Sequence, residues 1–211
     1  MSLEPPSRKT AGRPRSFDLD QVLDRAIPVF SERGLNGTAI SDLKPATGLT
    51  AGSLYKCFTD KNDIFRQALE HYGQHRKALL ADVAAHQGRG VDKLTLLLEA
   101  YGEKCSGDAG KRGCLVVLST AELSGLDEVS RGLVLSALAE VEAALEATIV
   151  EGARDGSMRA DLDPPATASL LWCMLLGLRL VGKTGIDRKA VSSVVQQALR
   201  LVTCSGQALP S

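Results

Sequence analysis

The chain alternates between segments with apolar residues at helical spacing and short polar segments that contain glycine or proline. Between Asp18 and Arg33 the apolar positions recur every three or four residues, and Gly34 follows the last turn. The same period continues beyond residues 88–90, and no segment shows the two-residue alternation of a half-buried strand. The pattern therefore predicts an all-α fold.

The expected helices are separated by turns that contain glycine, proline or small polar residues. Their expected bounds are 18–33, 38 to about 46, a short helix after Thr50, 61–85, 91–105, 114–124, 127 to about 154, 164–181 and 187–202. The glycine-bearing stretch 106–113 is expected to be a connection between two of them.

Residues 48–58, with the sequence GLTAGSLYKCF, have the features of a helix-turn-helix. A glycine ends one short helix, Thr50 is a good N-cap for the next, and Leu54 and Phe58 are four apart, so both face inward. Gly52 allows close approach to another surface. The outward-facing side chains are small or form hydrogen bonds: Ala51, Ser53, Tyr55 and Lys56. Such groups at the start of a helix suit the major groove of DNA, where slim side chains meet base edges and donors meet phosphates.

This run, followed by Thr59-Asp60-Lys61, resembles the recognition-helix signature GVSKGSLYHHF-x-x-K of the tetracycline-repressor (TetR/AcrR) family. The resemblance extends from Phe17 to about Leu69. It implies a three-helix head, with Thr38 at the start of its second helix and Lys61 opening a fourth helix. The sequence departs from the family pattern at Lys44-Pro45, where small helix formers are usual, and at Cys57, where histidine or tyrosine is usual.

A basic arm precedes this head. Residues 1–16 combine four basic residues with proline, glycine and serine, a composition that does not bury a core. Proline keeps the stretch around Arg13 and Arg15 extended, which suits a minor groove; a merely solvated tail is the alternative. The predicted DNA contacts are Arg13, Arg15, Thr38, Thr50, Ala51, Gly52, Ser53, Tyr55, Lys56 and Lys61.

Composition restricts both the mode of DNA binding and the compartment. The chain has 211 residues, 25 basic and 25 acidic, so DNA binding must come from a local patch. No apolar segment follows the start as in an export signal, and the longest apolar run, 166–178, is too short to span a bilayer. Five cysteines without paired CxxC spacing argue against disulfides and structural zinc. We expect a cytoplasmic protein with reduced thiols and no membrane contact.

The last two predicted helices indicate an oligomer. The helix from Pro164 is apolar nearly all round, and the final helix adds an apolar stripe; such surfaces need more partners than one protomer provides. In the resembled family the equivalent helices form a four-helix dimer interface. We expect a homodimer on a palindromic operator in double-stranded DNA. The interface is expected to include Leu175, Val191, Val195 and Leu199.

Cys114 is the strongest candidate for an effector-responsive group. It follows Lys111-Arg112-Gly113 and is expected in the first turn of a helix, where positive charge and backbone N–H groups favour the thiolate. The run KRGCLVVLSTAE, with GLRLVGK ending at Lys183, also resembles the electrophile- and oxidant-responsive branch of the family, in which a cysteine in a Gly-Cys-Leu turn is the sensing residue. The alternative is a small hydrophobe packed in the run 114–118. Lys183 is expected to approach the thiol, and Trp172 and Arg179 to line an effector cavity.

No catalytic, cofactor or metal site is predicted. His71 and His75 are four apart, but no carboxylate or third ligand in the sequence completes a metal site, and no nucleophile elbow or phosphate-binding glycine loop is present. The sequence therefore predicts a homodimeric transcriptional regulator, a repressor that a small-molecule or thiol-reactive effector releases from its operator.

Two alternatives to this function stay open. An activator or ligand-blind regulator is the alternative within the same class, and an enzyme or small-molecule carrier with a borrowed DNA-binding head is the alternative from another class. The expected domains are a basic flexible arm at 1–16, a helix-turn-helix DNA-binding domain at 17–60, and an effector-binding and dimerisation domain at 61–211.

Overall fold

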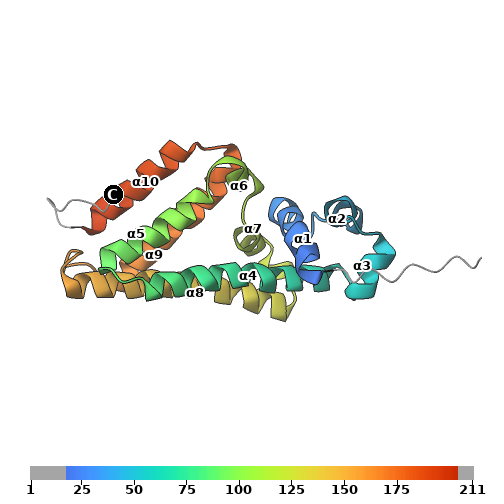
Figure 1. Cartoon of the computed structure of the whole chain (residues 1–211), viewed down its shortest axis with the longest axis horizontal. Helices are drawn as coiled ribbons and strands as arrows, with labels where there is room; N and C mark the ends of the chain where they lie inside the picture. Colours follow the sequence, from blue (N-terminus) through green and yellow to red (C-terminus); the bar gives the residue numbers. More distant parts are fainter. Residues whose placement is uncertain (1–17, 204–211) are drawn as a thin grey trace, which may run out of the picture.

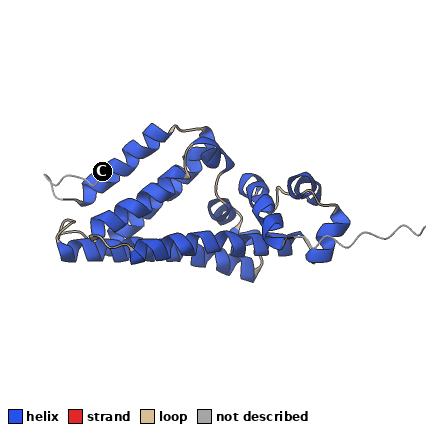
Figure 2. Cartoon of the chain, viewed as in Figure 1, coloured by secondary structure: helices blue, strands red, loops and turns tan. Residues whose placement is uncertain are grey.

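The computed structural model describes residues 18–203, and within this range the regular structure is helical throughout (Figure 2). The predicted all-α fold is confirmed. The arm predicted at 1–16, with Arg13 and Arg15, lies outside the described residues.

Three short helices form a head, and a fourth, longer helix links it to the rest of the chain. They are α1 (Leu19–Arg33), α2 (Ile40–Thr47), α3 (Ala51–Cys57) and the linking helix α4 (Lys61–Ala85). Three of the four begin with a side chain that accepts a backbone N–H of the first turn, namely Asp18, Thr50 and Asp60. These caps fix where each helix starts.

The second helix begins two residues later than the sequence predicts. Thr38 is buried and its hydroxyl donates to the carbonyl of Gly34, so it closes the preceding turn instead of capping the helix. The N-cap is Ala39, whose N–H is bonded by the Asp42 carboxylate at 2.8 Å.

The remaining helices form a body. They are α5 (Gly90–Glu103), α6 (Gly107–Arg112), α7 (Leu115–Ala121), α8 (Glu128–Asp155), α9 (Pro164–Val181) and α10 (Arg188–Val202), with single 3-10 turns η1 (Leu123–Gly125) and η2 (Gly182–Thr184). The expectation of a plain connection at 106–113 is wrong, because α6 occupies it. Six residues with two glycines are too few to show a helical period.

The head and the body lie at opposite ends of an elongated molecule (Figure 1). α2 and α3 form one tip, α4 and α8 run lengthwise, and α5, α9 and α10 pack at the other end. Within the body, both α6 and α7 contact α1 of the head.

The core of the head continues into the body. Phe30 of α1 meets Phe65 of α4 edge to face, with ring centroids 5.2 Å apart. The same buried cluster includes Leu115 of α7 and Val134 of α8. A second cluster fills the space between α5, α8, α9 and α10 and contains Trp172. The head is thus packed against α7 and α8, not joined to the body by α4 alone.

The four predicted interface residues require a correction. Leu175, Val191, Val195 and Leu199 are each at most 2% exposed, because α10 packs on α5 and the four side chains fill the protomer's own core. The large exposed apolar side chains of α8 and α9 are instead Val129, Leu135, Val150, Leu170, Leu180 and Val181.

The apolar run near residue 170 is also longer than the sequence analysis allowed. The span Pro164–Thr184, which is α9 with η2, has 21 residues and a mean hydropathy of 1.4, so its length and composition would suffice to cross a membrane. In the fold, this segment packs against α8 and supplies the body core, while its exposed face remains apolar.

Candidate functional site

The turn between α2 and α3 is held by short-range polar contacts. Gly48 ends α2 with φ of 72°, a left-handed conformation that favours glycine, and its N–H donates to the carbonyl of Lys44. The Thr50 hydroxyl accepts the Ser53 N–H at 3.2 Å and starts α3. Arg25 of α1 donates to the carbonyl of Thr47 at 3.3 Å, which fixes the turn to the first helix.

The predicted orientation of α3 is confirmed. Leu54 and Phe58 are buried, whereas Gly52, Tyr55 and Lys56 are exposed. Ala51 and Ser53 are half-buried at the start of the helix. A Cβ added at Gly52 would meet no atom of the chain within 4 Å, so the fold itself does not require glycine there. A close approach from outside the chain would explain it.

Two of the predicted DNA contacts have structural roles within the head. The Lys61 ammonium donates to the carbonyls of Leu35 and Thr38 at 2.7 and 2.8 Å. It therefore holds the α1–α2 turn against the start of α4. A contact between Lys61 or Thr38 and phosphate stays a prediction.

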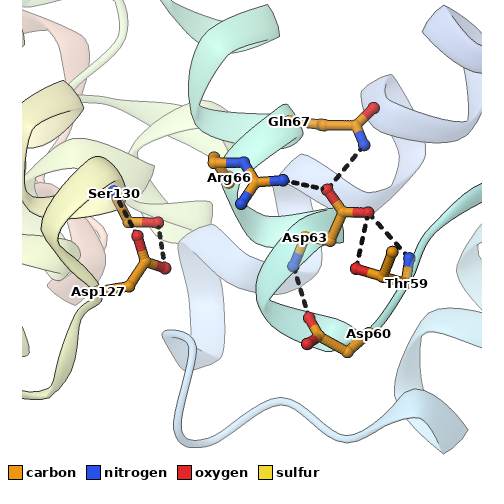
Figure 3. Close-up of polar contacts among 7 residues, drawn as sticks. All are labelled: Thr59, Asp60, Asp63, Arg66, Gln67, Asp127 and Ser130. Atoms are coloured by element: carbon orange, nitrogen blue, oxygen red, sulfur yellow. Dashed lines mark hydrogen bonds and ion pairs between the residues drawn. The ribbon is translucent and has the colours of Figure 1, made fainter.

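The junction of α3 with α4 is fixed by the Asp63 carboxylate (Figure 3). It accepts hydrogen bonds from the Gln67 amide, from the N–H and hydroxyl of Thr59, and from Arg66. The bonds from Gln67 and Thr59, together with the Arg66 charge, lower the pKa of Asp63 despite its burial. Asp60 caps the same helix by accepting the Asp63 N–H at 2.8 Å. These contacts fix the C-terminal end of α3 relative to the start of α4.

A small cavity of about 50 Å³ lies in the body between α4, α5, α7, α8 and α9. Its lining includes Trp172 and Arg179, as predicted, and also Tyr72, Tyr101 and Cys114. Tyr101 packs edge-on against Trp172, with ring centroids 5.8 Å apart. The cavity is an apolar chamber with a thiol and one buried cation in its wall.

Arg179 carries a charge, yet it is buried, with only 6% of its surface exposed. It donates to the carbonyl of Lys104 and, at 2.9 Å, to the carbonyl of Gly113. Gly113 has φ of 81°, and a Cβ there would press on the Ser31 carbonyl, so glycine is needed at this position. Arg179 thus fixes the turn that precedes Cys114.

Cys114 is the N-cap of α7, and its thiol lies 3.5 Å from the Tyr72 hydroxyl. Burial alone would raise the pKa of the thiol, but the charge of Arg179 and hydrogen bonds from Tyr72 and from the Val117 N–H lower it overall. Burial and the neighbouring thiolate raise the pKa of Tyr72, so its hydroxyl remains a donor.

The source of positive charge differs from the predicted one. Lys111 and Arg112 are exposed on α6, and the cation beside the thiol is Arg179 of α9. Lys183 does not supply it either, because its ammonium donates to the carbonyl of Glu32 at 3.2 Å and joins η2 to the end of α1.

The other buried thiol contrasts with Cys114. Cys105 donates to the carbonyl of Tyr101 at 3.1 Å, and burial raises the pKa of its thiol. Of the two, Cys114 therefore has the larger thiolate fraction near neutral pH.

Glu122 connects α7 to the head, and the sequence did not predict this role. The Glu122 carboxylate, at the C-terminal end of α7, accepts the N–H groups of Leu35 and Asn36 at 2.7 and 3.0 Å. The partners are more than 80 residues apart in the chain, so no local pattern indicates this contact. The seven-residue helix α7 therefore has the Cys114 thiol at its N-terminal end. At its C-terminal end it has the Glu122 carboxylate, which binds the α1–α2 turn.

Comparison with known proteins covers both parts of the chain. Residues 22–68 match the family model "Bacterial regulatory proteins, tetR family", and residues 90–198 match "Tetracyclin repressor-like, C-terminal domain". The HTH-type transcriptional repressor ComR of Escherichia coli is 25% identical over 92% of this chain and 93% of its own length.

Two solved structures extend the comparison. A cysteine mutant of the TetR family transcriptional regulator CifR, complexed with 26-bp double-strand operator DNA, is 32% identical, covers 90% of this chain and 100% of its own, and gives a TM-score of 0.76. A TetR family regulator from Agrobacterium tumefaciens, at 18% identity, covers 88% of this chain and 97% of its own with a TM-score of 0.80, a likeness of fold.

The chemistry of the cavity is testable on its own. Tyr72→Phe removes a donor to the thiolate, so the pKa of Cys114 should rise. The rate of Cys114 alkylation by iodoacetamide, followed by mass spectrometry across pH, should reach its half-maximum at a higher pH than in the wild type. Below that pH the variant should react more slowly, and at alkaline pH both should react alike. Tyr101→Phe, from the same cavity lining, is the matched control; identical pH profiles for Tyr72→Phe and wild type would contradict the assignment.

Proposed function

Because this chain belongs to the TetR family of helix-turn-helix transcriptional regulators, which are not enzymes, we propose that it is a repressor that acts as a homodimer on a palindromic operator. The observation that carries the proposal is the exposed surface of α3, where Gly52, Tyr55 and Lys56 face solvent on a helix fixed at both ends. The 32% identity to a regulator solved on operator DNA supports it. As a DNA-binding regulator, it would act in the bacterial cytoplasm.

The formal net charge of zero shapes this proposal. Without a basic surface overall, phosphate contacts must come from the head, and affinity should fall as salt rises in proportion to the few phosphates contacted. Ala51 and Ser53, at the start of α3, are the groups suited to base edges, whereas Tyr55 and Lys56 suit phosphates.

The reading role of α3 can be tested at Gly52. Gly52→Leu should lower operator affinity by roughly tenfold or more, since extra methylenes forced into a close contact cost about 1–3 kcal/mol. Gly52→Ala should have a smaller effect. Both variants should keep or raise the thermal midpoint, because glycine is about 1 kcal/mol poorer than alanine in a helix.

The measurement is a gel-shift titration on an operator selected from random duplexes under reductant. The matched control is Ala84→Leu at the exposed end of α4. Full operator affinity in Gly52→Leu would mean that another surface reads the DNA.

The proposed dimer uses the exposed face of α8 and α9. Leu170, Cys173, Gly177 and Leu180 recur at helical spacing along α9 and are all exposed. α9 packs along α8, which adds Leu135 and Val150 to the apolar surface. An apolar area of this extent on two long helices is typical of a subunit interface. Two heads held by such an interface could meet half-sites about one helical turn apart.

A charge on this face should separate the protomers. Leu180→Glu should weaken the dimer roughly 100-fold or more, because burying an unpaired carboxylate costs several kcal/mol. Leu201→Glu, a change at an equally exposed leucine of α10, should leave the dimer intact. Sedimentation velocity at micromolar concentration provides the measurement. A folded wild-type monomer, or equal behaviour of the two variants, would exclude this interface.

The proposed effector response starts at Cys114. The thiolate would attack an electrophilic carbon, form a C–S bond and release the leaving group, and the cavity of about 50 Å³ has little spare room for the added group. The bulk would push on the N-terminal end of α7. Because Glu122 at the other end holds the Leu35 and Asn36 N–H groups, a shift of α7 would move the α1–α2 turn and the head. A head spacing that mismatches the operator then releases DNA.

The thiol response needs a background in which competing thiols are removed. Cys57 is exposed on α3, so its modification would itself block DNA binding, and Cys173 is exposed on the proposed dimer face. Cys204 lies outside the described residues and is replaced as well. We therefore compare Cys57→Ser/Cys173→Ser/Cys204→Ser with the same chain carrying Cys114→Ser as well. Iodoacetamide should release the first protein from its operator in a gel shift and leave the second bound. Equal release would make the thiol structural and leave the effector as a non-covalent ligand of the Trp172 region.

A further inference from the structure

A second cluster of chemically capable side chains lies at the contact between α1 and α4, apart from the thiol cavity's cysteine and from the reading helix. His71 and His75 are one helical turn apart on α4, and Asp24 faces them from α1. The His71 Nε2 lies 2.8 Å from an Asp24 carboxylate oxygen, and the two imidazoles meet edge to face with centroids 5.8 Å apart. Asp24 is distant from the two histidines in the sequence, and the tertiary fold brings it next to them as a third candidate ligand.

The donor set matches a borderline divalent cation. Two histidines at positions i and i+4 of a helix present their ring nitrogens on one face, the spacing used by zinc-binding helices. One ligand atom from each of Asp24, His71 and His75 lies within 4.8 Å of the other two. Bonds of about 2.0–2.1 Å in tetrahedral geometry place ligand atoms about 3.3 Å apart, so closing the site requires side-chain rotations rather than helix movement.

The surroundings of the cluster also fit a metal site. His71 is buried, so one ligand is held in place, whereas Asp24 and His75 are exposed and have room at the surface to adjust their side chains. The other ring nitrogen of His71, Nδ1, lies 3.6 Å from a carboxylate oxygen of Asp20, one turn earlier on α1. A carboxylate on the far side of a ligating imidazole orients the ring and increases its basicity. Three protein ligands leave one position for water.

We propose that Asp24, His71 and His75 bind one divalent transition cation of the zinc class, which fastens α1 of the head to the linking helix α4. Imidazole favours zinc, copper or nickel over magnesium or calcium, which prefer oxygen ligands. His75 also belongs to the lining of the cavity that contains Cys114, but the proposed ligand set does not include the thiol and does not depend on the proposed thiol response.

Zinc alone is the probe, buffered by nitrilotriacetate. The protein is the full chain with Cys57→Ser, Cys173→Ser and Cys204→Ser, so that neither the exposed thiols nor the thiol outside the described residues binds the metal. We expect one zinc ion per protomer with micromolar or tighter affinity. His75→Ala and Asp24→Asn, both at exposed positions, should each weaken binding by at least about tenfold. His86→Ala, an exposed histidine at the C-terminal end of α4, is the matched control and should bind zinc unchanged.

Thermal unfolding gives a second readout that an ordinary ion pair would not produce. Zinc at about 100 times its dissociation constant should raise the thermal midpoint by about 4 °C or more in the parent and in His86→Ala, but not in His75→Ala. Magnesium should have no effect. Without zinc, His75→Ala should unfold like the parent, which separates ligation from a packing role. Millimolar or weaker zinc binding, or tight binding that survives His75→Ala, would overturn the proposal.

Discussion

The organisation of the body depends on the contacts that the buried Arg179 guanidinium makes with the segment between α5 and α7. A charge removed from water is tolerated only when hydrogen bonds and opposite charge replace the lost hydration. Here the carbonyls of Lys104 and Gly113 and the thiol of Cys114 provide that replacement. All three belong to the segment between α5 and α7, so one side chain of α9 fixes the chain on either side of α6. The same charge lowers the pKa of the thiol, which makes the stability of the turn and the reactivity of Cys114 two results of one contact.

The position of the head depends on contacts that run between backbone and side chain. The Lys61 ammonium and the Glu122 carboxylate bind opposite groups of the α1–α2 turn. The ammonium donates hydrogen bonds to two carbonyls, and the carboxylate accepts hydrogen bonds from two N–H groups. Both side chains bind backbone groups, which are the same whatever side chains the turn carries. These contacts therefore fix the position of the turn and do not depend on its side chains. Phe30, Phe65 and Leu115 belong to one core, so the head packs directly against α7. This coupling is what an allosteric regulator needs, since an effector acts only through differential stability of two arrangements.

Two groups of chemically capable side chains lie close to the head. The thiol of Cys114 lies at the start of α7 in an apolar cavity, and Asp24 and His71 lie at the α1–α4 contact. His75 belongs to both places, because it is close to Asp24 and His71 and also lines the cavity. A covalent change at the first would move α7, and a cation at the second would hold α1 on α4. The helix α3 contains neither Cys114 nor the two histidines, and its exposed residues include Gly52, Tyr55 and Lys56.

The sequence by itself determined the helical class, most helix positions and the inward face of α3, because period, caps and glycine stops are local properties. It also indicated Trp172 and Arg179 as cavity-lining residues, since a large aromatic ring and a lone cation in an apolar helix are unusual, whereas the fold adds Cys114 to the same lining. It did not determine which apolar face each helix buries. Val191 and Leu199 are as apolar as an interface requires, yet α10 buries them in its own protomer, whereas Leu170 and Leu180 of α9 are exposed.

Only the tertiary structure decided the long-range partners. The cation beside Cys114 is Arg179 of α9 and not the adjacent Lys111 or Arg112. The Glu122 carboxylate at the end of α7 binds the head. Asp24 of α1 lies beside two histidines of α4. The physical reason is common to all three. Charges and hydrogen bonds act over a few ångströms in space, and helix packing, not sequence distance, sets which side chains come that close.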